Sequence, residues 1–366
     1  MSGIRIFTWL AIVFAVLIPL FLFYNLSEKR GLIRNTGESD LEIETMAKNL
    51  NVPWSMDFLP DGRMIFTERS GKIRVLDLNT KEIKDAGEIT VAQISESGLL
   101  GIAVDPDFTE NGYVYVYYTY EDGGMKNKVS KFLLRDDQIT DESVIIDNIP
   151  GAEVHDGGRI KFGPDGKLYI TTGDATNPSL SQDQNSLAGK ILRLNKDGSI
   201  PEDNPFNNTV YSYGHRNPQG LAWHPVTNNL YETEHGPSMN DEMNFIEAGK
   251  NYGWPITCSE EAEGIEQPLL CFVDETIAPS GAAFFEGENE WKNSLFFTSL
   301  RGTHLHRVIF TGSKNIDRDE KLLPSYGRLR DVIYHDGYLY IATNNKDGRG
   351  FPVGDDDKIL RIKSAS

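Results

Sequence analysis

The chain has 366 residues, of which 39% are hydrophobic and 25% charged, so it can bury a large core and is neither disordered nor a polytopic membrane protein. Its net charge of −18 argues against nucleic acid as a general partner, because phosphates would be repelled. The 34 glycines, 17 prolines and 15 tyrosines favour turn-rich β structure over helix.

The first predicted element is a membrane-spanning helix. Residues 6–24 form a run of 19 residues without a charge, which is long enough to cross a bilayer core. The run ends in YNLS at residues 24–27 and has no small-residue cleavage site there, so an uncleaved anchor is favoured over a cleaved signal peptide. We expect an anchor over residues 1–30, a linker over 31–40 and one globular domain over 41–366.

A sequence phrase recurs along the rest of the chain. Each copy has one or two apolar residues, a turn and then alternating apolar residues, which predicts a β-hairpin. The copies lie at residues 58–67, 104–117, 162–171, 223–232, 291–298 and 334–342. Further strand-like runs follow at residues 73–77, 131–134, 190–194, 306–310 and 358–362.

These repeats predict an all-β fold, a six-bladed β-propeller with four-stranded antiparallel blades. The copies lie about 45 to 65 residues apart, which suits four strands with long loops. Such a ring must close, and residues 41–45 form a strand that can complete the last blade. A row of separate β domains is the alternative, but no linker divides the repeats.

The two cysteines, Cys258 and Cys271, lie 13 positions apart. In an oxidising compartment they can close a loop that stabilises the fold by about 3 kcal/mol. A pair of unlinked, partly buried thiols is the alternative. Zinc is not expected, because the chain has no CxxC spacing and no histidine pair nearby.

Polar residues flank the third copy of the phrase. His155 precedes its first strand and Asp174 follows its second strand, so the two side chains can meet at one end of adjacent strands. A carboxylate that fixes the imidazole tautomer makes such a histidine a general base. A purely structural hydrogen bond is the alternative.

A second polar segment contains Arg216, Asn217 and Gln219 between Gly and Pro residues. This stiff loop suits a planar or anionic ligand, because it offers a guanidinium group and two amides.

A third segment carries clustered cations. Arg328 and Arg330 alternate along one predicted strand, about 7 Å apart on the same face. They repel each other unless an anion lies between them, and either a ligand or a carboxylate such as Asp331 can supply it. Arg301 is a candidate for a third cation.

Residues 234–242 and 251–255 combine carboxylates with Gly and Pro turns. Carboxylate and freed carbonyl oxygens favour Ca²⁺, a hard cation that takes six to eight oxygen ligands. The spacing is not that of an EF-hand, and a solvated acidic loop is the alternative.

Taken together, the segments resemble the soluble quinoprotein glucose dehydrogenase and aldose sugar dehydrogenase family. The resemblance covers about residues 42–363 and rests on an ordered set of motifs: PWS (53–55), GLLGIA (98–103), GKILRL (189–194), GHRNPQG (214–220) and NYGWP (251–255). It implies a six-bladed propeller that binds pyrroloquinoline quinone (PQQ) and calcium. It also implies oxidation of the anomeric hydroxyl of aldose sugars to lactones.

The resemblance implies roles for single residues. His155 matches the general base for the sugar C1 hydroxyl, and Asp174 matches the carboxylate that orients it. Contacts with the quinone and its substrate are implied for Arg216, Asn217, Gln219, Arg301, Arg328 and Arg330.

Two calcium sites are also implied. The carbonyls of Gly236 and Pro237 match ligands of the catalytic calcium. Glu242 and the carbonyl of Tyr252 resemble a structural calcium site of the bacterial aldose dehydrogenase branch. The long insertions of the soluble glucose enzyme are absent, so this compact branch fits better.

Glu96 departs from the family, which usually has Gln or a small residue there. We expect Glu96 among the cofactor contacts, where its charge opposes a tricarboxylate unless it is protonated, turned outward or bound to calcium. We expect an extracytoplasmic enzyme, anchored in the membrane near an electron acceptor that is not identified. A calcium-dependent lactonase and a non-catalytic binding propeller are the alternatives.

Overall fold

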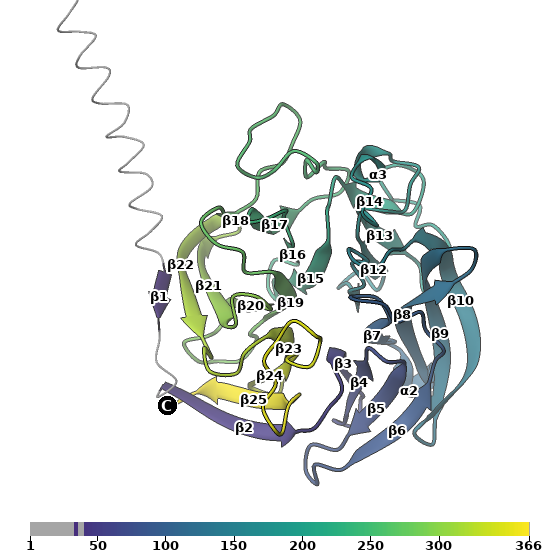
Figure 1. Ribbon diagram of the computed structural model, residues 1–366, viewed down its shortest axis with the longest axis vertical. Helices are drawn as coiled ribbons and strands as arrows, with labels where there is room; N and C mark the ends of the chain where they lie inside the picture. Colours follow the sequence, from purple (N-terminus) through teal and green to yellow (C-terminus); the bar gives the residue numbers. More distant parts are fainter. Residues whose placement is uncertain (1–32, 36–39, 366) are drawn as a thin grey trace, which may run out of the picture.

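The alternating sequence runs form strands in a ring of blades around a central axis (Figure 1). The computed structural model describes residues 33–35 and 40–365. The first blade contains β3 (Pro53–Phe58), β4 (Met64–Glu68), β5 (Lys72–Leu76) and β6 (Ile83–Glu88). The second contains β7 (Leu99–Val104), β8 (Tyr113–Glu121), β9 (Met125–Arg135) and β10 (Gln138–Pro150).

The third and fourth blades follow the same order. The third contains β11 (Ile160–Phe162), β12 (Leu168–Thr172), β13 (Lys190–Leu194) and β14 (Val210–Tyr213). The fourth contains β15 (Pro218–Trp223), β16 (Leu230–Glu234), β17 (Asp241–Ile246) and β18 (Leu270–Phe272). Two short helices lie in the loops, α2 (Phe108–Asn111) and α3 (Ser179–Gln182).

The last two blades complete the ring. The fifth contains β19 (Pro279–Phe284), β20 (Leu295–Ser299), β21 (Leu305–Gly312) and β22 (Asn315–Leu322). The sixth contains β23 (Leu329–His335), β24 (Tyr338–Thr343), β25 (Ile359–Ser364) and, as its outer strand, β2 (Leu41–Ala47). The described residues therefore form six sheets, as the repeats predicted.

The ring closes as expected from the sequence. The outer strand β2 pairs antiparallel with β25, with Leu41 opposite Ser364. Apolar side chains seal the same junction, because Met56 and Phe66 of the first blade pack with Ile333 and Tyr340 of the sixth. Because β2 comes from the start of the propeller and β25 from its end, their pairing closes the ring of six blades.

The predicted linker contains one strand. Within it, β1 (Ile33–Asn35) pairs parallel with the outer edge of β22 and adds a fifth strand to that sheet. The predicted anchor over residues 1–30 lies outside the described residues. In the part of the chain that the structure describes, no helix is long and apolar enough to cross a membrane.

The first strand of each blade lines the axis. The far ends of these six strands converge on a cavity of about 480 Å³, which opposes the mouth where the strands begin. Five of the six strand ends place an aromatic ring on this cavity: Phe58, Phe162, Trp223, Phe284 and Tyr334. We call this end the far mouth and the opposite end the near mouth.

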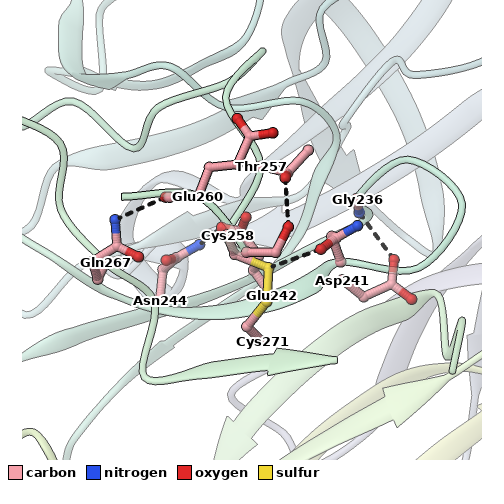
Figure 2. Close-up of a disulfide and its surroundings, with 11 residues drawn as sticks. Gly236, Asp241, Glu242, Asn244, Thr257, Cys258, Glu260, Gln267 and Cys271 are labelled. Carbon is pink, nitrogen blue, oxygen red and sulfur yellow. Dashed lines mark hydrogen bonds between the residues drawn. A yellow bond between two sulfur atoms is a disulfide. The ribbon is translucent and has the colours of Figure 1, made fainter. Parts of the chain in front are cut away.

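The two cysteines are joined in a disulfide, which the sequence had left open. The Cα atoms of Cys258 and Cys271 are 5.9 Å apart, inside the usual range for such bonds. Cys271 lies on β18 opposite Glu242 on β17, so the bond ties the long β17–β18 loop to the fourth blade (Figure 2).

Candidate active site

The near mouth brings His155 and Asp174 together. His155 lies in the loop that enters β11, and Asp174 follows β12 in the same blade. The two side chains meet with 2.8 Å between His155 Nδ1 and Asp174 Oδ1. The imidazole remains 19% exposed, whereas the carboxylate is only 1% exposed. The pair thus places a ring at the mouth with a buried anion behind it.

The backbone at this position is tightly constrained. His155 has a φ of +64°, a left-handed conformation that non-glycine residues seldom adopt. Its carbonyl oxygen packs against Gly173, where an added Cβ would lie 1.8 Å from that oxygen. Only glycine fits at residue 173, so the chain turns sharply into Asp174 and sets the distance between the two side chains.

Asp174 is held by further donors. The amide of Thr176 donates to Oδ1 over 2.8 Å, and the indole Nε1 of Trp254 donates to Oδ2 over 2.8 Å. An anion fixed in this way accepts the Nδ1 proton of His155, which leaves Nε2 as the basic ring atom. This is the arrangement that a general base requires.

Arginines surround the mouth beside this pair. Five of them lie near the carboxylates of Glu96 and Asp347: Arg69, Arg216, Arg328, Arg330 and Arg349. The near mouth therefore carries an excess of positive charge in a chain whose net charge is −18. Such a local field attracts anions.

Glu96 is ionised and paired. Burial alone would raise its pKa, but His235, the ion pair with Arg349 and the amide of His155 outweigh burial and lower the pKa to about 2. Arg349 from the β24–β25 loop pairs with this carboxylate and offsets its charge, a partner that the sequence did not predict. Glu96 also accepts the amide hydrogen of His155 over 3.3 Å, so it supports the loop that carries the base.

Arg328 and Arg330 have different partners. Arg328 donates to Asp347 Oδ2 through Nε (3.0 Å) and Nη2 (2.7 Å), so a protein carboxylate satisfies much of its charge. Arg330 instead donates to Gln219 Oε1 over 2.7 Å and lies over the ring of Trp54 at 5.5 Å. Burial lowers the pKa of Arg330 to about 9.

The carboxylate first considered for these arginines is engaged elsewhere. Asp331 pairs with Arg159, 3.0 Å from its Nη1, deep in the channel. Among the described residues, Arg330 donates to two neutral side chains, the Gln219 amide (2.7 Å) and the Ser280 hydroxyl (3.5 Å), which leaves its cationic charge for a ligand.

Unsatisfied donors converge on the same place. Among the described residues, buried side-chain nitrogens without a hydrogen bond include those of Arg69 (Nε), Arg216 (Nε), Arg330 (Nε) and His235 (Nε2). A buried unpaired donor costs about 1–3 kcal/mol, so this arrangement favours a ligand rich in acceptors. The donor set fits the polycarboxylate PQQ.

The remaining predicted contacts flank this group. Arg216 Nη1 donates to the His235 carbonyl over 3.1 Å, and its guanidinium lies 5.3 Å from the ring centre of Trp254. Asn217 is buried and accepts the amide of Gly157 over 3.0 Å. Arg301 is exposed on the β20–β21 turn, next to Leu300, whose carbonyl accepts from Arg328.

The turn predicted to bind the catalytic calcium is fixed by Asp241. Asp241 accepts the amides of Gly236 (2.9 Å), Ile277 (2.7 Å) and Ala278 (2.8 Å), so it ties the turn to the next blade. A Cβ at Gly236 would lie 1.9 Å from the carbonyl oxygen of Asn240, so only glycine allows the turn to close. Pro237 follows in this closed turn.

Glu242 belongs to a buried cluster in the fourth blade. Asn244 Nδ2 donates to Glu232 (3.0 Å) and to Glu242 (3.1 Å). Burial, followed by the charge of Glu234, raises the pKa of Glu232 and Glu242 well above the usual range, and burial also raises the pKa of Glu234.

His215 completes this cluster and lies against Tyr252. One ligand atom each of His215, Glu232 and Glu234 fall within 4.8 Å of one another. Burial lowers the pKa of His215 to about 3, so its 3.3 Å approach to Glu234 is not an ion pair. The ring of Tyr252 stacks on His215 at 4.8 Å.

The donor set of this cluster fits a hard cation. Among the described residues, the buried side-chain atoms without a hydrogen bond include Glu232 Oε1, Asn244 Oδ1 and His215 Nδ1. Carboxylate and amide oxygens are preferred calcium ligands.

The fold and the mouth define a six-bladed propeller with a cationic site on its axis that contains a His–Asp pair. A sequence profile described as "Glucose / Sorbosone dehydrogenase" matches residues 50–360. The chain belongs to the glucose/sorbosone dehydrogenase family.

Individual relatives of the chain have names that agree with this family. The chain is 33% identical to aldose sugar dehydrogenase YliI of Escherichia coli K12, over 84% of this chain and 91% of that protein. It is 36% identical to the PQQ-bound aldose sugar dehydrogenase of Streptomyces coelicolor, with a TM-score of 0.81 over 88% of this chain and 98% of that one. It is 41% identical to a Thermus thermophilus protein described as a "putative oxidoreductase (glucose dehydrogenase)", with a TM-score of 0.83 over 88% of this chain and 100% of that one.

Sequence reasoning missed several residues of the mouth. Arg69 and His235 directly follow the second strands of their blades, β4 and β16, as Asp174 closely follows β12. Aligning the six repeats by that strand end would have found both. Asp347 and Arg349 lie in the long β24–β25 loop, whose path no repeat predicts.

Proposed function

We propose that the protein is a PQQ-dependent dehydrogenase that oxidises the anomeric hydroxyl of aldose sugars to lactones. The observation that carries this proposal is the His155–Asp174 pair beside a mouth of arginines with unsatisfied donors. A lactonase would use the base but would not need the arginines. Membership of the family supports the same reading.

The arginines would hold the cofactor. Arg216 and Arg330 present buried donors to a planar anion, while Arg328 is oriented by Asp347 at the rim. The carbonyls of Gly236 and Pro237 would bind the catalytic calcium. When bound, PQQ would accept the hydride that leaves C1 of the sugar, and calcium would polarise the quinone as a Lewis acid.

His155 would move the proton. Its Nε2 takes the proton of the C1 hydroxyl, and the ionised Asp174 stabilises the resulting imidazolium while holding the ring in place. A positioned base of this kind contributes about 10²–10⁴ in rate. Glu96 keeps the histidine loop in place, because it accepts the amide of His155.

A reconstitution experiment tests the proposal. The purified full-length chain is titrated with PQQ in excess calcium, and the quinone absorbance is followed as a panel of aldoses is added. We expect saturable binding and reduction by at least one aldose, with the reduction lost in His155→Ala. Bound PQQ that no aldose reduces would reject the substrate class, and absence of binding would reject the cofactor.

We also propose that residues 1–30 anchor the enzyme with the propeller on the extracytoplasmic side. The uncharged run and the disulfide support this arrangement. A tag placed after Ser366 should be digested by protease added to intact cells or spheroplasts, and protection of the tag would contradict an outward-facing domain.

A further inference from the structure

Trp254 lies at the point where three parts of the mouth meet. It belongs to the β17–β18 loop of the fourth blade, yet it is bound to the third blade and its outgoing loop. Its amide donates to the Gly214 carbonyl over 2.8 Å, and its own carbonyl accepts from Gln182 Nε2 over 2.7 Å. These bonds fix the backbone of the residue, so the direction of the indole is set.

The indole contacts two of the predicted active-site residues. Its Nε1 donates to Asp174 Oδ2 over 2.8 Å, and its ring faces the Arg216 guanidinium at 5.3 Å. A cation at this distance from the face of a tryptophan ring is attracted to it. The Trp254 side chain thus links Asp174, the partner of His155, to Arg216, a predicted cofactor contact.

The two carboxylate oxygens of Asp174 accept hydrogen bonds from different side chains. Oδ1 accepts from His155 Nδ1, and Oδ2 accepts from the indole. A carboxylate held through both oxygens cannot rotate without breaking a charge-assisted hydrogen bond. The indole therefore fixes the plane of the carboxylate on which the imidazole depends.

We propose that Trp254 is a positioning residue for the His155 base. Through Asp174 it keeps the imidazole in the tautomer whose Nε2 is basic and holds the ring toward the mouth. The indole N–H group also draws negative charge away from the Asp174 oxygen that it binds. A weaker charge on Asp174 stabilises the imidazolium less, so it limits the rise in the pKa of His155. This inference rests on the proposed function, in which His155 takes the substrate proton.

The disulfide restrains the segment that carries Trp254. Cys258 follows four residues after Trp254 and is bonded to Cys271 on β18. Cys258 Sγ also lies 3.9 Å from Asn240 Oδ1, at the turn that precedes β17. The β17–β18 loop is thus held at two points near Trp254, by the hydrogen bond to Gly214 and by the disulfide at Cys258. The indole extends from this restrained segment to Asp174 of the third blade.

The kinetic test replaces Trp254 by Phe in the full-length enzyme loaded with PQQ and calcium. Trp254→Phe keeps a ring beside Arg216 but removes the N–H group. We expect kcat to fall about tenfold, as for a lost charge-assisted hydrogen bond, with little change in KM for the aldose. Trp223→Phe at the far mouth makes the same chemical change and should leave kcat unchanged.

The pH profile provides a readout that a merely structural role would not move. Groups facing His155 are Asp174, Glu96, Asp156 and His235. Removing the indole donor leaves more negative charge on Asp174, so the acid limb of kcat/KM should move to higher pH. An unchanged profile with an unchanged kcat would overturn the proposal.

A measurement without cofactor separates this proposal from the proposed function. Imidazole ¹⁵N resonances of the full-length protein report the tautomer and titration of His155, assigned with His155→Gln. The wild type should show Nδ1–H with a bare Nε2, and Trp254→Phe should shift that equilibrium and its titration midpoint. Identical His155 spectra in both proteins would overturn the proposal whether or not PQQ binds.

A second variant tests the proposal if Trp254→Phe does not fold. Gln182→Ala releases the Trp254 carbonyl without touching Asp174, and it should shift the same resonance by a smaller amount. No shift in a folded Gln182→Ala protein, together with loss of folding in Trp254→Phe, would assign Trp254 to stability and would also overturn the proposal.

Discussion

The two mouths of the channel are built by the same six strands, but they differ in the side chains that gather at them. At the far mouth, five of the six inner strands end in an aromatic ring, and Lys161 and Asp57 line the cavity. At the near mouth, the loops that enter the inner strands carry His155 and Arg216, and the loops that follow the second strands carry Arg69, His235 and Arg349. The comparison shows that the scaffold fixes where side chains gather, while the loops decide the chemistry.

Burial acts on charges at both mouths. At the far mouth it lowers the pKa of Lys161 to about 8 and raises the pKa of Asp57 to about 6, so both groups move toward neutrality. At the near mouth Glu96 moves the other way, because His235 and the Arg349 ion pair outweigh burial. Arg349 offsets the negative charge that Glu96 keeps, so near-mouth cations without a carboxylate partner, such as Arg330, remain available to an anion.

The largest effect should separate the two mouths by cofactor affinity. Arg330→Gln removes a buried cation with an unsatisfied Nε, and it should weaken PQQ binding about 10- to 100-fold, as expected for one charged hydrogen bond. Lys161→Met removes a cation from the far mouth and should leave the affinity unchanged. Fluorescence titration measures the PQQ affinity of both variants. An equal loss of affinity in the two would show that the near mouth does not bind the cofactor preferentially.

The disulfide tests how far the near mouth depends on its loops. Cys258→Ser with Cys271→Ser should lower the free energy of unfolding by about 3 kcal/mol. It should also lower kcat by a smaller factor than Trp254→Phe, because the loop keeps its hydrogen bond to Gly214. Denaturant unfolding and steady-state kinetics measure the two effects, and an unchanged kcat would confine the bond to stability.

Calcium should stabilise the fourth blade in a pH-dependent way. Because burial raises the pKa of Glu232, Glu234 and Glu242, the cation-free folded state holds more protons than the unfolded state above about pH 4.5. Its stability should therefore fall as pH rises from about 5 toward 8. Calcium replaces these protons, so without PQQ it should raise Tm more at pH 8 than at pH 5.

Two variants check the origin of that calcium effect. Glu242→Gln should reduce the difference in Tm gain between the two pH values. Glu247→Gln alters a glutamate outside the cluster, which pairs with Lys314 at the surface, and should preserve the difference. A calcium effect that is the same at both pH values would exclude proton displacement from the cluster.

The smallest effect concerns Glu96. Glu96→Gln removes a negative charge from the near mouth and frees Arg349, so PQQ binding should tighten a few-fold at low salt. The gain should shrink at high salt, because exposed Arg349 is screened. Affinity measured at two ionic strengths checks this, and weaker binding at both would mean that Glu96 acts mainly by holding His155.

The repeat predicted the scaffold because it reflects backbone rules. The Asp-Gly turn at residues 165–166 places Gly166 at a φ of +71°, and the alternating residues around it form β11 and β12. The closing strand β2 followed from the need to complete a ring. Residues next to strand ends, such as His155 and Asp174, could be placed for the same reason.

The pairings inside the near mouth could not be predicted in the same way. Arg349 reaches Glu96 from 253 residues away, and Asp347 orients Arg328 from a loop without a repeat pattern. Cys258 and Cys271 offered two states that their spacing does not separate. Such contacts depend on how long loops fold over the ring, which local propensity does not encode.

A single-turnover assay tests the central claim most directly. Full-length protein loaded with one equivalent of PQQ and excess calcium is mixed with an aldose that reduces it, and both lactone and reduced PQQ are counted. The account predicts one lactone for each PQQ reduced, and neither product in His155→Ala. Hydrolysis of added lactone without any reduction of PQQ by aldoses would contradict it and would assign the near mouth to a hydrolase.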